Sequence, residues 1–256
     1  MNAKPQLVLL HGWASHTDVF RSLTRALEKK FRVTALPLPG YGGVPACEPY
    51  TPDRMAAQLA ASLGQSVANH CHVLGWSLGA QVALAWARRA PAQVSRLALV
   101  AATPCFVQRE GWLYGATPAL MRQFTAQLKR DSATLLRRFV ALQAQGDANA
   151  VRVAHQLRTA LFTHAAPVPA VLEAGLDILR TTDLRDGLGG VLQPALVMHG
   201  EADAVTPCAA GEALSRLLPN ARFEKIPGAG HAPFLCRADA CAAMLTEFFH
   251  ESAARA

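Results

Sequence analysis

The chain has 256 residues, of which 51% are hydrophobic and 17% are charged, and its formal net charge is +7. This composition excludes a disordered chain, and no apolar stretch reaches the length of a membrane-spanning helix. The length suits one large α/β domain, alone or with an insertion. The first residues run into a short strand rather than a signal peptide, and the six cysteines lack disulfide or metal-site spacing. We therefore expect a cytoplasmic protein with reduced thiols and no bound metal.

Short apolar segments alternate with helical patterns along the chain. Strands are predicted at residues 6–10, 32–36, 70–74, 96–100, 195–198 and 222–226. Helices are predicted at residues 52–68, from 78 to about 89, and at 238–250. This alternation predicts an α/β fold in which helices flank a mostly parallel central sheet on both faces. In such folds ligands bind beyond the carboxyl ends of the strands.

The strand pattern stops between residues 107 and 186. Four helices are predicted there, at 118–130, 132–145, 147–164 and 168–180, with Ser132 and Asp147 as N-caps and Gly146 as a C-cap. We therefore expect a core formed by residues 1–106 and 187–256 and a helical insertion at 107–186. An all-helical insertion between strands is a candidate lid, and a helical excursion packed elsewhere on the core is the alternative.

A G-x-S-x-G pattern, Gly-Trp-Ser-Leu-Gly at residues 75–79, joins a predicted strand to a predicted helix. In that context the pattern indicates a nucleophile elbow, a turn too tight for side chains beside the serine. A Gly/Ser turn that only caps the helix is the alternative. The elbow interpretation makes Ser77 the candidate nucleophile.

A serine nucleophile requires a base and an acid that orients the base. Asp203 follows the strand at 195–198, and His231 follows the strand at 222–226. Taken singly, either residue fits an ordinary turn or loop, and Glu201 is the rival for the acid. The order Ser77, Asp203, His231, each after the end of a predicted strand, matches the α/β-hydrolase architecture and predicts a catalytic triad.

Two backbone N–H groups are predicted to form the oxyanion hole. One belongs to Leu78, which follows the nucleophile at the start of a helix. The other belongs to Trp13, in the loop after the first strand, where Gly12 allows the backbone to approach closely. His11 is interpreted as a structural residue that braces this loop.

Positive charge is concentrated in the predicted insertion. Residues 122–158 contain seven basic and two acidic side chains, a difference of +5 within the chain's total of +7. The helical pattern places apolar residues on one face and basic residues on the other. A basic surface suits an acidic protein partner, a merely solvated face is the alternative, and the lack of interleaved aromatic residues argues against nucleic acid.

With these motifs the chain resembles the α/β-hydrolase superfamily and, within it, the pimeloyl-acyl-carrier-protein methyl ester esterases of biotin biosynthesis. The closer resemblance rests on residues 75–79, 103–106, 138–143, 175–179, 183–185 and 231–234. It implies a monomeric serine carboxylesterase without a cofactor that removes the methyl group from a pimeloyl chain carried by acyl carrier protein. It also implies a substrate site lined by Trp13, Ser77, Leu78, Phe139, Val140, Ala141, Leu142, Gln143 and His231.

Carrier docking is predicted on the basic helices of the insertion, at Arg137, Arg138, Arg152 and Arg158.

Two departures from the family are evident. The strand pair that many relatives place before the first strand is missing, which predicts a shorter sheet, and Val151 and His155 stand where basic residues are expected. Neither nucleic acid nor a membrane is expected as a partner. Alternative functions are hydrolysis of other small esters, lactones or C–C bonds, cofactor-free perhydrolysis, or non-catalytic binding on the same scaffold.

Overall fold

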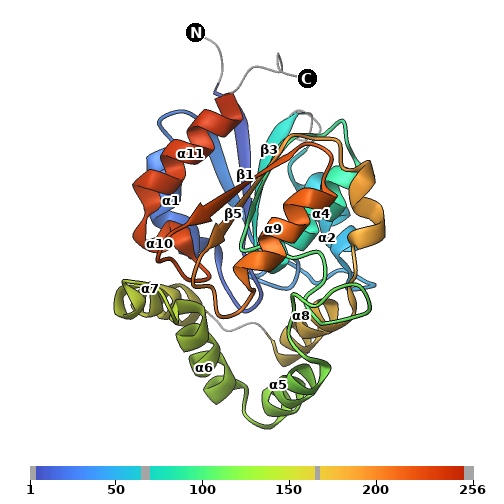
Figure 1. Ribbon diagram of the computed structural model, residues 1–256, viewed down its shortest axis with the longest axis vertical. Helices are drawn as coiled ribbons and strands as arrows, with labels where there is room; N and C mark the ends of the chain where they lie inside the picture. The colour runs from blue at the N-terminus through green and yellow to red at the C-terminus, as the bar shows by residue number, and fades with distance from the viewer. Residues whose placement is uncertain (1–3, 65–69, 165–167, 251–256) are drawn as a thin grey trace.

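The computed structural model describes residues 4–64, 70–164 and 168–250. A six-stranded parallel sheet forms its centre, in the order β2-β1-β3-β4-β5-β6 (Figure 1). The strands are β1 Gln6–Leu10, β2 Arg32–Leu36, β3 Cys71–Trp76, β4 Val94–Val100, β5 Ala195–Gly200 and β6 Ala221–Ile226. All six lie where the apolar segments predicted them, and no strand precedes β1 in the described residues. The predicted α/β-hydrolase architecture with a parallel sheet is confirmed.

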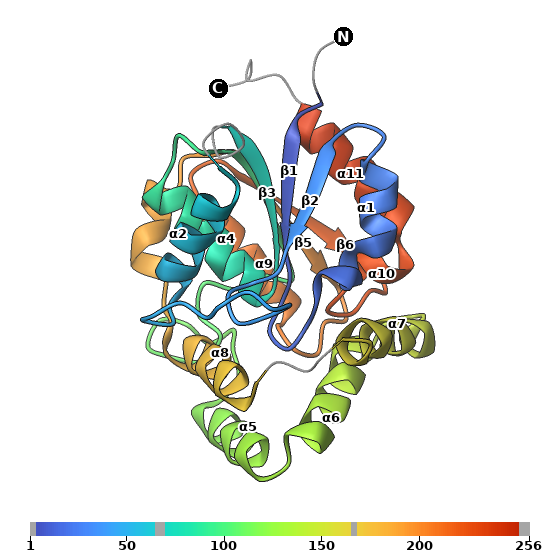
Figure 2. The ribbon, with the colours of Figure 1, turned by 180° about the vertical axis from the view of Figure 1, so that it is seen from behind.

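Helices cover both faces of the sheet, as Figures 1 and 2 show from opposite sides. One face carries α1 (Arg21–Leu27) and α11 (Ala238–His250), and the other carries α2 (Pro52–Ser62), α4 (Leu78–Arg89) and α9 (Cys208–Leu217). Because both faces are covered, every residue of β1, β3 and β5 is buried. Short helical turns complete this part: η1 Thr17–Phe20, η2 Arg185–Gly190 and α10 Pro233–Cys236.

Several predicted boundaries differ from the structure. The helix predicted at 52–68 ends at Ser62, and residues 65–69 lie outside the described residues. Helices α1 and α9 were not predicted, because both are short, with seven and ten residues. None of the helices in the described ranges is both long and apolar enough to cross a membrane. All six cysteines are free thiols.

Four helices connect β4 to β5 and form what we call the helical insertion. They are α5 Pro118–Arg130, α6 Ser132–Ala144, α7 Ala150–Phe162 and α8 Pro169–Thr181, close to the predicted ranges. Figure 1 shows them at the end of the sheet opposite the two chain termini. The predicted apolar stripes face inward, since Leu135, Leu136, Val153 and Leu157 are buried.

The predicted N-caps of two insertion helices are wrong by one or two residues. Asp131, not Ser132, caps α6, because its carboxylate accepts the backbone N–H of Thr134 at 3.0 Å. The N-cap of α7 is Asn149; Oδ1 of Asp147 accepts the backbone N–H of Asn149 at 2.7 Å, and its other oxygen bonds outside the insertion, as described below. Gly146 follows α6 with φ of 79°, the left-handed conformation that a helix C-terminus favours.

Candidate active site

Ser77 lies in a sharp turn between β3 and α4. Its backbone has φ of 56° and ψ of −118°, a conformation that is strained for any residue other than glycine. A Cβ atom on Gly75 would collide with the backbone of Gly79, and one on Gly79 would collide with the carbonyl oxygen of Leu10. The two glycines are therefore required by close backbone packing, and the turn has the geometry predicted for a nucleophile elbow.

The two predicted oxyanion donors flank this turn. Leu78 is the first residue of α4, so its N–H has no acceptor within the helix. A Cβ atom on Gly12 would lie 3.2 Å from the Cβ atom of Ser77, which places the backbone of the loop after β1 beside the serine. The indole of Trp13 is fixed by a hydrogen bond of 2.9 Å from its Nε1 to the carbonyl oxygen of Leu172 in α8. The oxyanion role of both N–H groups stays a prediction.

Asp203 and His231 are in direct contact. Oδ2 of Asp203 lies 2.8 Å from Nδ1 of His231, and both side chains are almost fully buried. The other carboxylate oxygen, Oδ1, accepts the backbone N–H groups of Val205 at 2.8 Å and Thr206 at 2.9 Å. Burial by itself raises the pKa of Asp203, but the charge of His231 and the hydrogen bonds from His199 and His231 outweigh it, so the pKa lies well below its usual range. Asp203 is therefore a fixed, ionised acceptor for the His231 ring.

Glu201, the rival for the acid, is directed elsewhere. Its side chain is exposed, lies 3.6 Å from Nζ of Lys225 and accepts the backbone N–H of Gly228. A second histidine that was not predicted, His199, approaches the same oxygen of the acid, with Nε2 3.1 Å from Oδ2 of Asp203 and 2.9 Å from the carbonyl oxygen of Thr206. The sequence signal for His199 is a histidine that ends an apolar strand, and that signal does not specify a partner.

The free nitrogen of the His231 ring is unpartnered. Among the described residues, Nε2 of His231 is buried without a hydrogen-bond partner, and no hydrogen bond joins it to Ser77. The two segments are nevertheless tied, because the indole of Trp76 donates to the carbonyl oxygen of His231 at 2.8 Å. Apo active sites often show such loosened catalytic contacts. The geometry leaves Nε2 free to act as a base.

An apolar cavity of about 100 Å³ opens beside Ser77. Among the described residues that line it, only Ser77 has a hydroxyl or charged group. The loops of the core and the helices α5, α6 and α8 supply the rest: Trp13, Phe106, Ala116, Leu120, Met121, Phe124, Phe139, Leu142, Leu176, Leu179, Ala204 and Val205. A cavity of this lining suits an aliphatic chain that ends at the serine.

Only part of the predicted substrate set lines this cavity. Phe139 and Leu142 do. Val140 is buried outside the lining, Ala141 is exposed, and the carbonyl oxygen of Gln143 accepts the backbone N–H of His231 at 3.1 Å. The α6 helix explains this division, because residues three apart share a face and the intervening ones point away. The lining residues of α5 and α8 were not predicted, since helical periodicity identifies an inward face but not which cavity it borders.

His11 braces the loop after β1, as predicted. Its ring is fully buried, Nε2 accepts the backbone N–H of Leu38 at 3.1 Å, and Nδ1 lies 2.9 Å from the carbonyl oxygen of Gly12. These contacts use one ring nitrogen as acceptor and the other as donor, which is the neutral imidazole. Burial lowers the pKa of His11 from 6.5 to about 4.

We expect His11 to make the fold less stable in acid. Because its pKa is about 4 when folded and 6.5 when unfolded, the unfolded chain binds the proton first as the pH falls. The free energy of unfolding should therefore decrease between pH 6.5 and pH 4, by about 3 kcal/mol from this group. Urea unfolding across this range measures the loss. His11→Gln should be less stable at pH 7 but show a shallower pH dependence, and an unchanged slope would contradict the assignment.

The connection between α6 and α7 holds the loop that carries His231. The carboxylate of Asp147, which is 6% exposed, accepts the backbone N–H of Gly230 at 3.0 Å, and the N–H of Ala148 donates to the carbonyl oxygen of Gly228 at 2.9 Å. The thiol of Cys236 lies 3.4 Å from both Asp147 carboxylate oxygens. The helical insertion and the His231 loop are thus joined by a hydrogen-bond network centred on the buried Asp147, for which the sequence pattern predicted only a capping role.

Asp147→Ala should lower kcat roughly 10-fold with little change in KM, because the variant loosens the His231 loop without touching the cavity. Steady-state kinetics measures this split. Asp147→Asn, which keeps an acceptor oxygen, should recover most of the loss. The control is Asp131→Ala, which removes an exposed helix cap of the same insertion and no contact to the loop. Equal losses of kcat in both alanine variants would show that Asp147 only stabilises the insertion.

The four predicted docking arginines are all exposed on α6 and α7. Arg137 donates to Oγ1 of Thr134 at 3.0 Å, and the side chains of Arg138, Arg152 and Arg158 have no hydrogen bond or ion pair within the described ranges. Arg152 and Arg158 line an open groove at the start of α7 together with His155. The basic side chains are therefore available to an anionic partner, and their docking role stays a prediction.

Comparison with known proteins agrees with this geometry. A model of the alpha/beta hydrolase fold family matches residues 5–238. The chain is 42% identical over 231 residues to the pimeloyl-[acyl-carrier protein] methyl ester esterase of Nitrosomonas europaea, covering 90% of both chains. It is 42% identical to the esterase of that name from Aromatoleum aromaticum, covering 95% of this chain and 98% of the relative.

A solved structure shows the same fold. An esterase from Exiguobacterium antarcticum superposes with a TM-score of 0.87 at 25% identity, covering 98% of this chain and 94% of that one. The family match spans both parts of the core and the helical insertion between them. The chain belongs to the alpha/beta hydrolase fold family and, within it, to the family of the pimeloyl-[acyl-carrier protein] methyl ester esterases.

Proposed function

We propose that this protein is a serine carboxylesterase that hydrolyses the methyl ester of pimeloyl-acyl-carrier protein, a step of biotin biosynthesis. The observation that carries the proposal is the buried Asp203–His231 pair, with a free imidazole nitrogen, beside a strained serine turn that borders an apolar cavity. The relatives from Nitrosomonas europaea and Aromatoleum aromaticum bear the name of this esterase, which supports the substrate.

The proposed reaction has two steps. Nε2 of His231 takes the Ser77 hydroxyl proton as Oγ attacks the ester carbonyl, and the N–H groups of Leu78 and Trp13 stabilise the oxyanion. His231 then gives the proton to the leaving methoxide, which departs as methanol and leaves the acyl group on Ser77. A water molecule, deprotonated by His231, attacks this acyl-enzyme. The products are the free carboxylic acid and regenerated Ser77.

Asp203 fixes the direction of proton transfer in this scheme. Its ionised carboxylate accepts the Nδ1–H of His231 at 2.8 Å, which selects the tautomer with a free Nε2 and stabilises the imidazolium formed during attack. Two backbone N–H groups hold the other carboxylate oxygen in place. The acid therefore needs no rearrangement when the histidine becomes charged.

The helical insertion acts in this proposal as a lid over the acyl chain. Phe124 of α5, Phe139 of α6 and Leu176 of α8 supply apolar surface around the cavity, which favours the methylene chain between the two ends of the substrate. The methyl ester reaches Ser77, and the thioester end with its carrier protein stays outside. Cleavage at the ester rather than the thioester follows from this orientation.

The basic outer surface of the insertion is the proposed docking site for acyl carrier protein. Arg137, Arg138, Arg152 and Arg158 give α6 and α7 a positive face, and complementary charge accelerates encounter with an acidic protein. Val151 and His155 occupy α7 where basic residues of the family are expected. His155 lies in the same groove as Arg152 and Arg158, so this chain uses the neighbouring arginines for the contact.

A substrate panel tests the proposal. The specificity constant kcat/KM should be highest for methyl-pimeloyl-carrier protein, lower for a methyl ester on a short thioester arm, and lowest for lactones and for perhydrolysis of acetate. Short p-nitrophenyl esters should be hydrolysed, because the catalytic groups do not depend on the carrier. A higher kcat/KM for a lactone or for perhydrolysis would show that the proposed substrate is wrong. If no ester is turned over, a non-catalytic binding protein would be favoured.

A further inference from the structure

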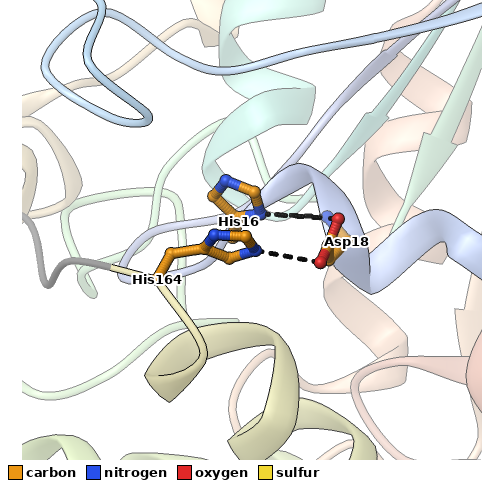
Figure 3. Close-up of side chains that lie close together, drawn as sticks. All are labelled: His16, Asp18 and His164. Carbon is orange, nitrogen blue, oxygen red and sulfur yellow. Dashed lines mark hydrogen bonds and ion pairs between the residues drawn. The ribbon is translucent and has the colours of Figure 1, made fainter.

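Three metal-binding side chains from distant parts of the chain converge where the helical insertion meets the core. His16 and Asp18 lie in the loop after β1 and in η1, and His164 lies two residues after the end of α7 (Figure 3). Nε2 of His164 is 2.9 Å from Oδ2 of Asp18, and the rings of His16 and His164 stack with centroids 3.7 Å apart. We call these residues the His–Asp–His cluster.

The donor atoms of the cluster are close enough to share one ion. One ligand atom from each residue lies within 4.8 Å of the others, and Nδ1 of His16 is 3.8 Å from Oδ1 of Asp18. Two atoms held about 2.1 Å from one ion are separated by roughly 3 to 4 Å, so small side-chain movements bring the three donors to bonding distance.

The type of donor selects the type of ion. Two imidazoles and one carboxylate favour zinc, nickel, cobalt or iron over magnesium and calcium, which prefer oxygen ligands. The side chains of His16, Asp18 and His164 are 18%, 28% and 40% exposed, so water can reach the remaining coordination positions. The donor set therefore resembles an open three-ligand centre rather than a closed structural one.

The existing contacts define which donor atoms a metal would use. Nδ1 of His16 accepts the backbone N–H of Asp18 at 3.2 Å as the cap of η1, so this nitrogen carries a lone pair and not a proton, and a metal ion would take the place of that hydrogen bond. The hydroxyl of Thr17 lies 3.4 Å from the same atom. Arg21 donates to Oδ2 of Asp18 at 2.6 Å, which leaves Oδ1, on the side of His16, as the oxygen for a metal.

We propose that the His–Asp–His cluster binds one divalent transition-metal ion and so fastens the end of α7 to the loop after β1. That loop also contains Trp13, and α7 carries Arg152 and Arg158. An ion at this junction restrains the helical insertion relative to the core, outside the cavity beside Ser77. The site is independent of the proposed ester hydrolysis, since none of its residues lines that cavity.

Cobalt titration of the chelator-treated full-length protein tests the site. We expect one Co²⁺ per chain, with visible absorption from nitrogen and oxygen ligands and no thiolate charge-transfer band. His16→Ala, Asp18→Asn and His164→Ala should each weaken binding by at least about 10-fold. The matched control is His155→Ala, which removes an exposed histidine that borders the same groove as Asp18 but lies outside the cluster. Its affinity should equal that of the wild type.

A stability measurement supplies a second readout. Saturating Co²⁺ should raise the thermal midpoint of the wild type and of His155→Ala by about 5 °C, and it should not change that of His164→Ala. The metal-free midpoints of all variants show whether each is folded. Wild-type affinity in all three cluster variants, a thiolate band in the spectrum, or the absence of binding to the wild type would overturn the proposal.

Discussion

Ser77→Ala, Asp203→Asn and His231→Ala should each lower kcat for a soluble ester by at least about 10³-fold. Ser77→Ala removes the attacking oxygen, and His231→Ala removes the group that accepts its proton. Asp203→Asn keeps the shape of the acid but replaces the acceptor at 2.8 Å from Nδ1 of His231, which favours the wrong tautomer. Single-turnover and steady-state rates on a p-nitrophenyl ester measure the loss.

The three losses should not add. Because the residues act as one unit, the Ser77→Ala/His231→Ala double variant should be about as slow as either single variant. Ser215→Ala is the matched control, since this half-buried hydroxyl on α9 bonds, among the described residues, only to the carbonyl oxygen of Glu212. Additive losses, or Ser77→Ala with near wild-type activity, would contradict the triad.

Charge reversal of Arg138 and Arg152 to glutamate should lower kcat/KM for the carrier-bound methyl ester by roughly 10- to 100-fold at low salt. Both side chains are exposed and without a protein partner among the described residues, so their loss should not disturb the insertion. Hydrolysis of a p-nitrophenyl ester should change little. The ratio of the two specificity constants should approach that of the wild type at high salt, because ions screen exposed charges.

A matched charge change separates docking from net charge. Lys29→Glu/Lys30→Glu reverses two exposed lysines just before β2, at the amino ends of the parallel strands and far from the insertion. This variant should keep the wild-type ratio. Equal losses on both substrates for the arginine variant would mean that the arginines maintain the insertion. The same loss in the lysine variant would show that the effect depends on the net charge of the protein and not on docking at the insertion.

The serine turn and the strands could be predicted because each depends on local sequence. The glycines on both sides of Ser77 are required because the backbone packs closely within this one turn. The strands are apolar because helices cover both faces of the sheet. Asp203 and Glu201 both follow β5 and could be ranked only by their position after the strand. The structure distinguishes them, because only Asp203 contacts His231.

Contacts between distant segments could not be predicted in the same way. Asp147 has a typical N-cap position, yet its carboxylate bonds to Gly230, 83 residues away. His16 and His164 are 148 positions apart in sequence, and neither stands in a metal-binding motif. Such pairs depend on how the helical insertion packs on the core, which is decided by the packing of many side chains at once.

Mass spectrometry of methyl-pimeloyl-carrier protein tests the central claim most directly. After incubation with the wild-type enzyme, the intact carrier protein should keep its thioester-linked chain and lose the mass of one methylene, the difference between a methyl ester and an acid. With Ser77→Ala at the same concentration, the mass should not change. Release of the whole acyl chain from the carrier protein, or equal demethylation by Ser77→Ala, would contradict the proposed reaction.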